Sequence, residues 1–394
     1  MTVVASKYNI ELRDKDGNLK KYLTPWADRP SWEWNSVGGC GRASITIQGD
    51  YRRIKTYPDD DIQIRIKSGS TTKLVYRGYA LDPVPTLSDK ESIGIECQGY
   101  SDKLSRYIVH DDNSEKIYTN EDIASIVADI IDTFVTPYSG ITKGTIDPAT
   151  YAPNELRFKT DAAEALRTLA TLEGDIDWGV DEDLVFFWRK RSSGIRRKWL
   201  IGGKVTLYEP ARSDSDIVNV IRFQGGDVDG SPLEAVLQSN ESISYFGRRE
   251  KSASNSAIVT SDVAARYISA LLRQQSIPQY KTRAIVKNIN GRLEDTLPIG
   301  KIAFIDPADD RVIPVYGSVA SGGTGTIYGK KYAGGSEHYY GGIFASQVDR
   351  IRYILSDEDG KFDIELTLGG NTNKQAEYEK RIELELQNLK QRTS

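Results

Sequence analysis

The stretch that decides the fold lies between residues 78 and 100 and contains, in order, Gly78-Tyr79-Ala80, Leu87-Ser88-Asp89 and Ile93-Gly94-Ile95-Glu96-Cys97. Residues 342–370 repeat this order as Gly342-Ile343-Phe344-Ala345, Leu355-Ser356-Asp357 and Phe362-Asp363-Ile364-Glu365-Leu366. Each copy has an aromatic residue followed by alanine, a turn entry, and a strand with apolar residues at alternate positions. A β fold duplicated within one chain makes a monomer with two similar faces, which suits ring assembly better than a single active site.

The overall composition is that of an ordinary soluble protein. The chain has 394 residues, of which 27% are charged and 39% hydrophobic, and its net charge is −4. This length predicts two to four domains, and the small net charge gives no footprint for specific binding of nucleic acid. No apolar run reaches the roughly 18 residues that a membrane span needs, and the N-terminus lacks the features of a signal peptide. We therefore expect synthesis in the cytoplasm, with Cys40 and Cys97 as buried, reduced thiols.

Residues 1–100 and 206–370 are expected to form two related antiparallel β-barrel domains in a mainly β fold. Apolar residues occupy every second position in stretches such as 43–47 and 62–66, which predicts antiparallel strands with one solvated face. Clean alternation of this kind is typical of a barrel or a sandwich. The second domain also contains a helical excursion at 238–280 and a Gly/Tyr-rich loop at 317–342.

Residues 101–205 are expected to form an inserted α+β domain between the two barrels. One helix is predicted to begin near Thr119 and to end near Pro137, and a second is predicted to begin after Thr160. Two strands at 184–188 and 198–201 flank a Ser-Ser-Gly turn, which predicts a β-hairpin.

Residues 371–394 are expected to form a C-terminal helix with a narrow apolar stripe, made of Tyr378, Ile382, Leu386 and Leu389. A stripe this short cannot hold an isolated coiled coil together, so the helix needs partner helices. We take the stripe as a candidate contact with other copies of the chain or with a partner.

The residues that usually carry catalysis or bind metals are sparse. His110 and His338 are the only histidines and lie far apart, so a catalytic triad or a multi-histidine metal site is not expected. The Asp-Gly stretches near Asp14, Asp227 and Asp357 lack the remaining ligands of a calcium loop and instead indicate hairpin turns. No cofactor, metal or catalytic residue is expected.

Two groups of residues are weaker candidates for binding. Trp26, Trp32 and Trp34 could form a sugar-stacking platform, although a tryptophan plug that closes the end of the barrel is the preferred interpretation. The predicted hairpin carries six basic residues on its two arms, namely Arg189, Lys190, Arg191, Arg196, Arg197 and Lys198. These could bind an acidic or phosphate-bearing partner, and the simpler interpretation is a solvated hairpin tip.

Loose motifs in a fixed order resemble a known family. In the first barrel they are Trp32-x-Trp34, Gly38-Gly39-Cys40-Gly41-Arg42-Ala43-Ser44-Ile45-Thr46-Ile47, Gly78-Tyr79-Ala80 and Glu96-Cys97-Gln98-Gly99-Tyr100-Ser101. Further on they are Lys159-Thr160-Asp161-Ala162-Ala163-Glu164-Ala165-Leu166 with Gly174-x-x-x-Trp178, then Tyr245-Phe246-Gly247-Arg248-Arg249-Glu250 and Thr260-Ser261-Asp262-Val263-Ala264. Over most of residues 20–370 the chain resembles the baseplate hub or tail-tip proteins of long-tailed bacteriophages and related contractile injection particles.

The resemblance implies a structural hub in the virion, at the tail tip or baseplate. It implies a homotrimer in which two barrels per subunit form a pseudo-sixfold ring. One side of that ring would face the tail tube or a distal tail protein ring, and the other a central spike, fibre or tape-measure protein. Because the chain ends soon after the second barrel, it lacks the C-terminal peptidase domain of some members, and we expect no enzymatic activity. The alternatives are a carbohydrate-active tail lysin that uses the tryptophans and a carboxylate pair, or a carbohydrate-binding adhesin.

Overall fold

A computed structural model describes residues 8–48, 54–68, 71–81, 84–86, 92–112, 114–192, 194–213, 215–290, 301–306, 342–355 and 361–369. The C-terminal helix expected at 371–394 lies outside these residues, as does nearly all of the Gly/Tyr-rich loop expected at 317–342. The described residues form a mainly β structure with helices in its middle third, which confirms the expected fold class.

The N-terminal strands form what we call the first β set. They are β1 (Tyr8–Arg13), β2 (Leu19–Tyr22), β3 (Ala27–Asn35), β4 (Gly38–Gln48), β5 (Asp61–Ser68), β6 (Thr71–Ala80), β7 (Val84–Thr86) and β8 (Ser92–Gly99). Hydrogen bonding joins six of them in the order β3-β4-β8-β6-β5-β1, with every neighbour antiparallel. Alternate side chains, among them Ile45, Ile64 and Ile95, are buried on one face, as the period-two pattern predicts.

The second β set is built from strands on both sides of a long excursion. It contains β16 (Ile195–Leu200), β17 (Val205–Ser213), β21 (Gln279–Asn290), β22 (Lys301–Asp306), β23 (Gly342–Leu355) and β24 (Lys361–Gly369). Its pairing order is β17-β21-β24-β23-β22-β16, in which only the last pair is parallel. Strand by strand this order repeats that of the first set.

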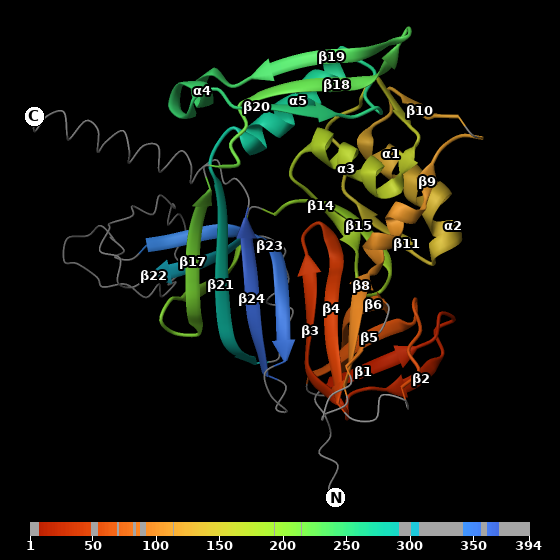
Figure 1. Cartoon of the computed structure of the whole chain (residues 1–394), viewed down its shortest axis with the longest axis vertical. Coiled ribbons are helices and arrows are strands. Elements are labelled where there is room, and N and C mark those ends of the chain that lie inside the picture. The colour runs from red at the N-terminus through yellow and green to blue at the C-terminus, as the bar shows by residue number, and fades with distance from the viewer. Residues whose placement is uncertain are drawn as a thin grey trace, which may run out of the picture.

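The two sets belong to one 17-stranded sheet rather than to two separate barrels. The end strand β3 pairs antiparallel with β23, so that its outer edge is used by the second set and does not close the first set on β1. No closed barrel is found among the described strands, which corrects the barrel part of the expectation. Figure 1 shows β3 and β23 side by side at the centre of the molecule.

The register of the strands refines the internal repeat. The sequence pattern matches Cys97 to Leu366 and Ala80 to Ala345. In the structure Cys97 pairs with Ala80, but Leu366 pairs with Ile351. Ala345 and Ile351 lie on opposite sides of the bulge between Val348 and Arg350, where the alternation of apolar residues changes phase, so the match made from the sequence pattern is out of register in this strand.

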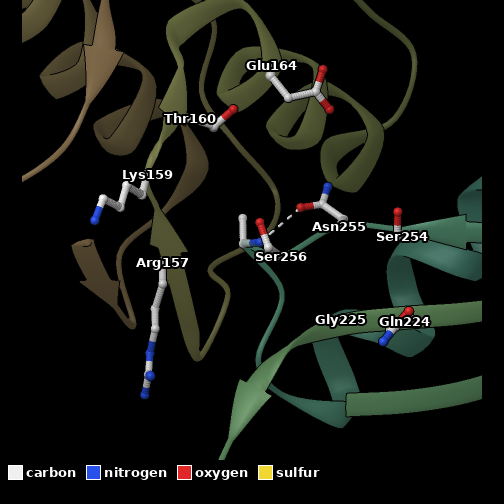
Figure 2. Close-up of a pocket in the computed structure, with 10 residues that line it drawn as sticks. Arg157, Lys159, Thr160, Glu164, Gln224, Gly225, Ser254, Asn255 and Ser256 are labelled. Carbon is white, nitrogen blue, oxygen red and sulfur yellow. Dashed lines mark hydrogen bonds between the residues drawn. The ribbon is translucent and has the colours of Figure 1, made fainter. Parts of the chain in front are cut away.

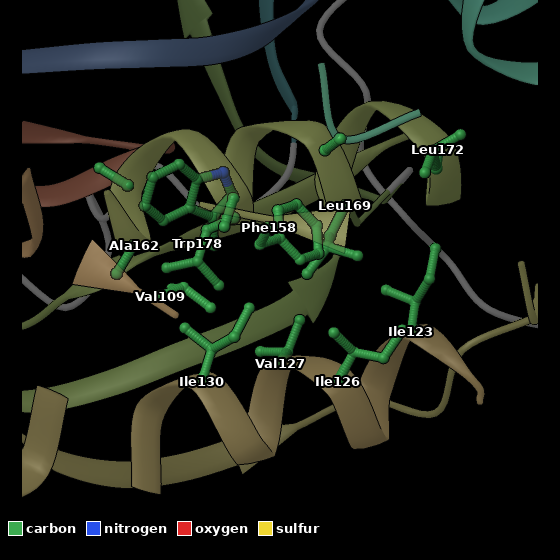
Figure 3. Close-up of a cluster of buried hydrophobic side chains, with 14 of the residues drawn as sticks. Val109, Ile123, Ile126, Val127, Ile130, Phe158, Ala162, Leu169, Leu172 and Trp178 are labelled. Atoms are coloured by element: carbon green, nitrogen blue, oxygen red, sulfur yellow. The ribbon is translucent and has the colours of Figure 1, made fainter. Parts of the chain in front are cut away.

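The middle of the chain forms an α+β body with its own core. Its first part contains the 3-10 helix η2 (Tyr100–Arg106), β9 (Ile108–Val109), β10 (Lys116–Thr119), α1 (Ile123–Asp129), the π-helical segment η3 (Ile130–Val135), α2 (Thr136–Ser139), β11 (Thr142–Ile146), β12 (Glu155–Phe158), β13 (Thr160–Asp161), α3 (Ala162–Glu173), β14 (Ile176–Val180) and β15 (Val185–Lys190). Figure 3 shows the apolar side chains of α1 pointing toward Leu169 of α3, with Phe158 between them.

The two helices predicted from the sequence, which correspond to α1 and α3, begin later than expected. Asp122 caps α1 by accepting a hydrogen bond from the backbone N–H of Ser125, and Asp161 caps α3 in the same way through Glu164. Threonine and aspartate both cap well, and the two aspartates stand at the right distance from the first free N–H groups. Pro137 lies in the first turn of α2 rather than ending the helix, and Gly140, at a φ of 71°, ends it instead.

The excursion between the strands of the second set packs on the α+β body. It consists of β18 (Val220–Val228), β19 (Ser231–Gln238), α4 (Asn240–Phe246), β20 (Glu250–Ser254) and α5 (Ser261–Gln275). Phe223, Ile258 and Ile268 share one hydrophobic core with the helices α1 and α3. The Arg266 Nε atom also donates a hydrogen bond of 2.8 Å to the Leu172 carbonyl. We therefore propose that the α+β body takes in this excursion as well as most of residues 101–205.

The hairpin expected over residues 184–201 does not form. β15 pairs with β14 and β11, whereas β16 pairs with β22 of the second set. The chain therefore passes from the α+β body to the second β set between residues 190 and 195 and does not fold back as a hairpin. Within the described part of the chain, no helix is both long and apolar enough to cross a membrane.

Candidate functional site

The two β sets and the α+β body meet at one place, which we call the joint. It is made by β3 and β4 of the first set, β14 and β15 of the body, and β23 of the second set. β14 pairs in parallel with the start of β4 through Gly38 and Gly39, while β3 pairs with β23. These strand pairs set the orientation of the first β set, the α+β body and the second β set relative to one another.

Glycines allow the backbones to approach closely where β4 crosses β14. A Cβ atom on Gly39 would lie 2.1 Å from the Val180 carbonyl oxygen, and one on Gly179 would lie 2.3 Å from the carbonyl carbon of Gly38. The Ser101 hydroxyl donates to the Gly38 carbonyl and accepts a hydrogen bond of 2.7 Å from the Val180 N–H. Packing between backbones thus explains Gly39, whereas Gly38 has a φ of 110° and Gly41 faces the side chain of Asn35.

The two buried tryptophans of β3 pack against the second β set and the α+β body. Trp32 is 1% exposed and stacks on Tyr353 of β23, with ring centroids 5.3 Å apart. Trp34 is also buried and stacks on Phe187 of β15 at 5.6 Å. Trp26 is 40% exposed and lies under the Lys21 ammonium. The three tryptophans therefore form no common sugar-stacking platform, and two of them pack in the interior between sheets and body rather than as a plug, because the described strands close no barrel.

Two of the predicted basic residues lie in the joint. The Arg189 guanidinium lies over the Phe187 ring at 4.5 Å and over the Trp34 ring at 5.6 Å. The Nε atom of Arg191 forms an ion pair of 2.9 Å with Asp177 of β14. Lys190 is exposed.

The other three basic residues lie in β16, and only their backbone is described. Arg196, Arg197 and Lys198 are strand residues, and two of them, Arg197 and Lys198, pair with Ile302 and Ala303. The structure thus separates the six residues into two groups on strands with different partners. No single cluster on a hairpin tip is formed.

Two carboxyl groups lie beside Arg191, the buried Asp177 and the half-buried Asp349. Asp177 is 1% exposed, and its pKa is raised by burial, although Arg191 acts in the opposite direction. Burial also raises the pKa of Asp349 to about 6, with Arg191 lowering it and Asp177 raising it further. Asp349 sits at a bulge in β23, where its carbonyl accepts a hydrogen bond of 2.8 Å from the N–H of Ser36. Neither group was predicted from the sequence, where the only local signal is a single aspartate inside the apolar strand Ile176–Val180.

A shallow polar pocket of about 290 Å³ lies at the border between α3 and the sheet of β18 and β20. Figure 2 shows its lining, which includes Thr160, Glu164, Ser254, Asn255 and Ser256. Asn255 is engaged in the fold, because its Oδ1 accepts from the Ala257 N–H and its Nδ2 donates to Thr168. Glu164 is the only carboxylate of the lining and is paired with Arg167 at 2.6 Å. The pocket thus lacks the two carboxylates that glycoside hydrolysis requires.

The cysteines and two of the three Asp-Gly stretches have structural roles, and the stretch at Asp357 lies outside the described residues. Cys40 and Cys97 are buried free thiols, as expected, and burial raises the pKa of both. Asp14 accepts hydrogen bonds from the N–H groups of Asp16 and Asn18, which makes this stretch a turn. Asp229 and Gly230 both have positive φ and join β18 to β19 as a hairpin. Among the described residues no group of three or more His, Cys, Asp or Glu side chains could hold a metal ion.

Comparison with known proteins identifies the fold. No protein-family profile matches the sequence, and a search of curated proteins gave no match. The 43 kDa tail protein of prophage MuSo2 from Shewanella oneidensis is similar, with a TM-score of 0.57 and 13% identity over 92% of this chain and 98% of that chain. The tail protein from Neisseria meningitidis MC58 has a TM-score of 0.58 and 11% identity over 92% and 97%.

The chain therefore has the fold of these phage tail proteins over nearly its whole length. At this level of sequence identity the likeness establishes the fold alone. The resemblance noted from the sequence is thus confirmed at the level of the fold.

Proposed function

We propose that this chain is a structural protein of a phage tail or a related contractile injection particle, and that three copies form a pseudo-sixfold ring at the distal end of the tail tube. The observation that carries the proposal is the repeated pairing order of the two β sets. Because each copy contributes two similar sets, three copies present six similar units to a partner ring of six. The likeness to two phage tail proteins supports the tail as the place of assembly.

The proposed ring joins two kinds of partner. The tail tube or a distal tail protein ring would bind on one side, and a central spike, fibre or tape-measure protein on the other. The apolar stripe of the C-terminal segment, from Tyr378 to Leu389, is proposed as a contact with the other copies or with the central partner. In this proposal Arg189 and Arg191 hold the joint together through their contacts with Trp34 and Asp177. Of the three neighbouring basic residues 189–191, only Lys190 is exposed.

The proposed role is not enzymatic. Trp32 and Trp34 are buried, so they cannot stack on a sugar, and the described polar pocket carries one carboxylate. These observations favour the structural role over the carbohydrate-active lysin and over the carbohydrate-binding adhesin. Purified protein should therefore leave cell-wall gels intact in zymography. Clearing of the gel that disappears when one carboxylate is substituted would contradict the proposed non-enzymatic role.

The ring is tested by measuring mass and shape. Analytical ultracentrifugation over a concentration series should detect a species of three chains, and electron microscopy should show six similar lobes around its centre. A chain that stays monomeric at the highest concentration, or a ring of another copy number, overturns the trimer. Gold-labelled antibodies should mark tails at the end away from the capsid. Labelling of the bacterial surface without particles would instead support the adhesin.

A further inference from the structure

The hairpin of β18 and β19 lies at the outer edge of the α+β body. Its sheet has the order β19-β18-β20, and in Figure 1 β19 runs along the top of the molecule, with β18 between it and β20. The helix α5 packs against one face of this sheet. Among the described strands β19 pairs with β18 alone, so that its other edge, which we call the open edge, has no partner strand there.

The hydrogen bonds of the hairpin show which backbone groups of β19 face the open edge. The N–H of Ser239 donates to the Asn219 carbonyl, so in the next pair, Val220 with Gln238, the backbone groups point away from each other. The two kinds of pair alternate along an antiparallel ladder. Three residues of β19 therefore direct their N–H and C=O groups toward the open edge, namely Glu234, Val236 and Gln238.

The open edge lacks most of the features that keep edge strands from pairing. Lysine, a central proline or a bulge in the edge strand commonly prevents such pairing. β19 contains no lysine, and its only charged residue is Glu234. From Glu234 to Gln238 it pairs with β18 without a shift in register. Pro232 stands at its second position and has no N–H, so a ladder on the open edge would begin at Glu234.

The side chains of β19 determine what an added strand must carry on each face. Leu233, Ala235 and Leu237 pack on the core of the α+β body but remain half-buried. Apolar side chains at every second position of an added strand would cover the rest of their surface. On the opposite face of β19, Glu234 is exposed and Val236 is 53% exposed. An added strand thus needs one apolar face and one face that suits a carboxylate.

The charge of the hairpin favours a basic partner. Between Arg222 and Arg248 the sequence has no lysine or arginine but four acidic residues, which are Asp227, Asp229, Glu234 and Glu241. Arg222 and Arg248 are themselves both paired with Glu250 of β20. A segment with this charge attracts a chain that carries lysine or arginine, most strongly at low ionic strength.

A second copy of this chain fits the open edge less well. Antiparallel pairing of β19 with β19 of another copy requires a twofold axis between the copies. The proposed ring has the tail tube on one side and a central partner on the other, so no twofold axis relates its copies. Such pairing would also bring two acidic hairpins side by side.

We infer that the open edge of β19 receives an extended basic segment of another chain of the particle, which adds a strand beside residues 234–238. Apolar side chains alternate with lysine or arginine in this segment, so that one face packs toward α5 and the other lies beside Glu234. The inference rests on the proposed function, because the segment belongs to a neighbouring component of the tail. Backbone hydrogen bonds give such contacts their affinity, and the alternating side chains give them specificity.

Hydrogen exchange resolved to single amides tests the contact without any substitution. In the purified chain the amides of Ala235 and Leu237, which bond to β18, should exchange slowly. The amides of the three edge residues, Glu234, Val236 and Gln238, should exchange quickly. In assembled tails the exchange of these three should slow by roughly tenfold or more. Equal rates in the two samples would overturn the inference.

A proline at the open edge tests the strand pairing through assembly. Val236→Pro removes an N–H that points to the open edge and not to β18, so the chain should stay folded. Val236→Thr is the matched control, because it keeps both the N–H and the β-branched shape. In competition with the unmodified chain, Val236→Pro should enter tails roughly tenfold less often, since a ladder hydrogen bond is lost and the ring obstructs the edge. Val236→Thr should enter normally, and equal incorporation of the two variants would overturn the inference.

The outcomes separate the inference from the function on which it rests. Absence of the unmodified chain from tails overturns the proposed function together with the inference. Its presence in tails with fast exchange at the three edge residues overturns the inference alone. Slow exchange at these residues already in the purified chain would place a second copy on the open edge and overturn the assignment to another chain. Far-ultraviolet circular dichroism checks the fold of each variant, and if Val236→Pro unfolds, the exchange measurement decides.

Discussion

At the scale of single residues, Asp349 makes the joint sensitive to pH. Burial raises its pKa in the folded chain to about 6, whereas the carboxyl of an unfolded chain titrates near pH 4. The unfolded chain therefore releases this proton at lower pH than the folded chain. The contribution of the group to stability is present in full below about pH 4 and is lost as the pH rises through 6.

Asp349→Asn, which keeps the side chain neutral, should therefore stabilise the protein at alkaline pH. At pH 8 we expect its free energy of unfolding to exceed that of the unmodified protein by on the order of 2 kcal/mol, with a much smaller difference at pH 4.5. Urea denaturation at the two pH values measures this. Asp16→Asn, which removes a carboxyl group from an exposed turn, is the control for the change in net charge. A difference that is the same at both pH values would show that charge plays no part.

Trp32 is the residue that binds the two β sets most directly. Trp32→Ala should cost about 3–5 kcal/mol, because it removes a fully buried ring that stacks on Tyr353. Trp26→Ala, at a partly exposed ring of the same type, should cost about 1 kcal/mol or less. Equilibrium denaturation of the two variants side by side gives the comparison. Equal losses would mean that the β3–β23 contact contributes little.

At the scale of elements, the crossing of β4 and β14 depends on the absence of side chains. Gly39 has a φ of 69° and also faces the Val180 carbonyl, so Gly39→Ala adds a clash to an unfavourable backbone conformation. We expect a loss of roughly 3 kcal/mol or more in the free energy of unfolding. Gly17→Ala is matched in φ, at 84°, but has open space around it and should cost only about 1–2 kcal/mol. If both variants lost the same amount, the close approach would not matter.

The elements also show what the sequence could and could not reveal. The buried stripe of α3 and the alternation in β4, β5 and β8 are local patterns, and they were predicted correctly. The partners of β15 and β16 depend on strands far away in the chain, and an apolar pair around Ser-Ser-Gly looks like a hairpin whatever those partners are. The two carboxyl groups of the joint were not predicted for the same reason, since Asp177 and Asp349 approach each other only after the α+β body and the second β set have packed.

At the scale of the whole molecule, the C-terminal segment remains a sequence-based prediction. If the stripe of Ile382 and Leu389 packs against other copies, each apolar side chain gains roughly 1.5–3 kcal/mol of transfer free energy on burial. The double variant Ile382→Ser with Leu389→Ser should weaken trimerisation or attachment of the central partner while the rest stays folded. Ultracentrifugation together with far-ultraviolet circular dichroism measures both properties. Unchanged mass and normal incorporation into particles would contradict the proposed contact.

The split core of the α+β body has a consequence for synthesis on the ribosome. Leu169 and Leu172 emerge early, but Ile258, Val263 and Ile268, which complete the same core, emerge almost a hundred residues later. At typical elongation rates this gap lasts on the order of 5–20 s, during which the apolar face of α3 lacks part of its cover. The nascent chain is therefore open to aggregation or to chaperone binding over this interval, and slowing translation between residues 173 and 258 should lower the yield of soluble protein.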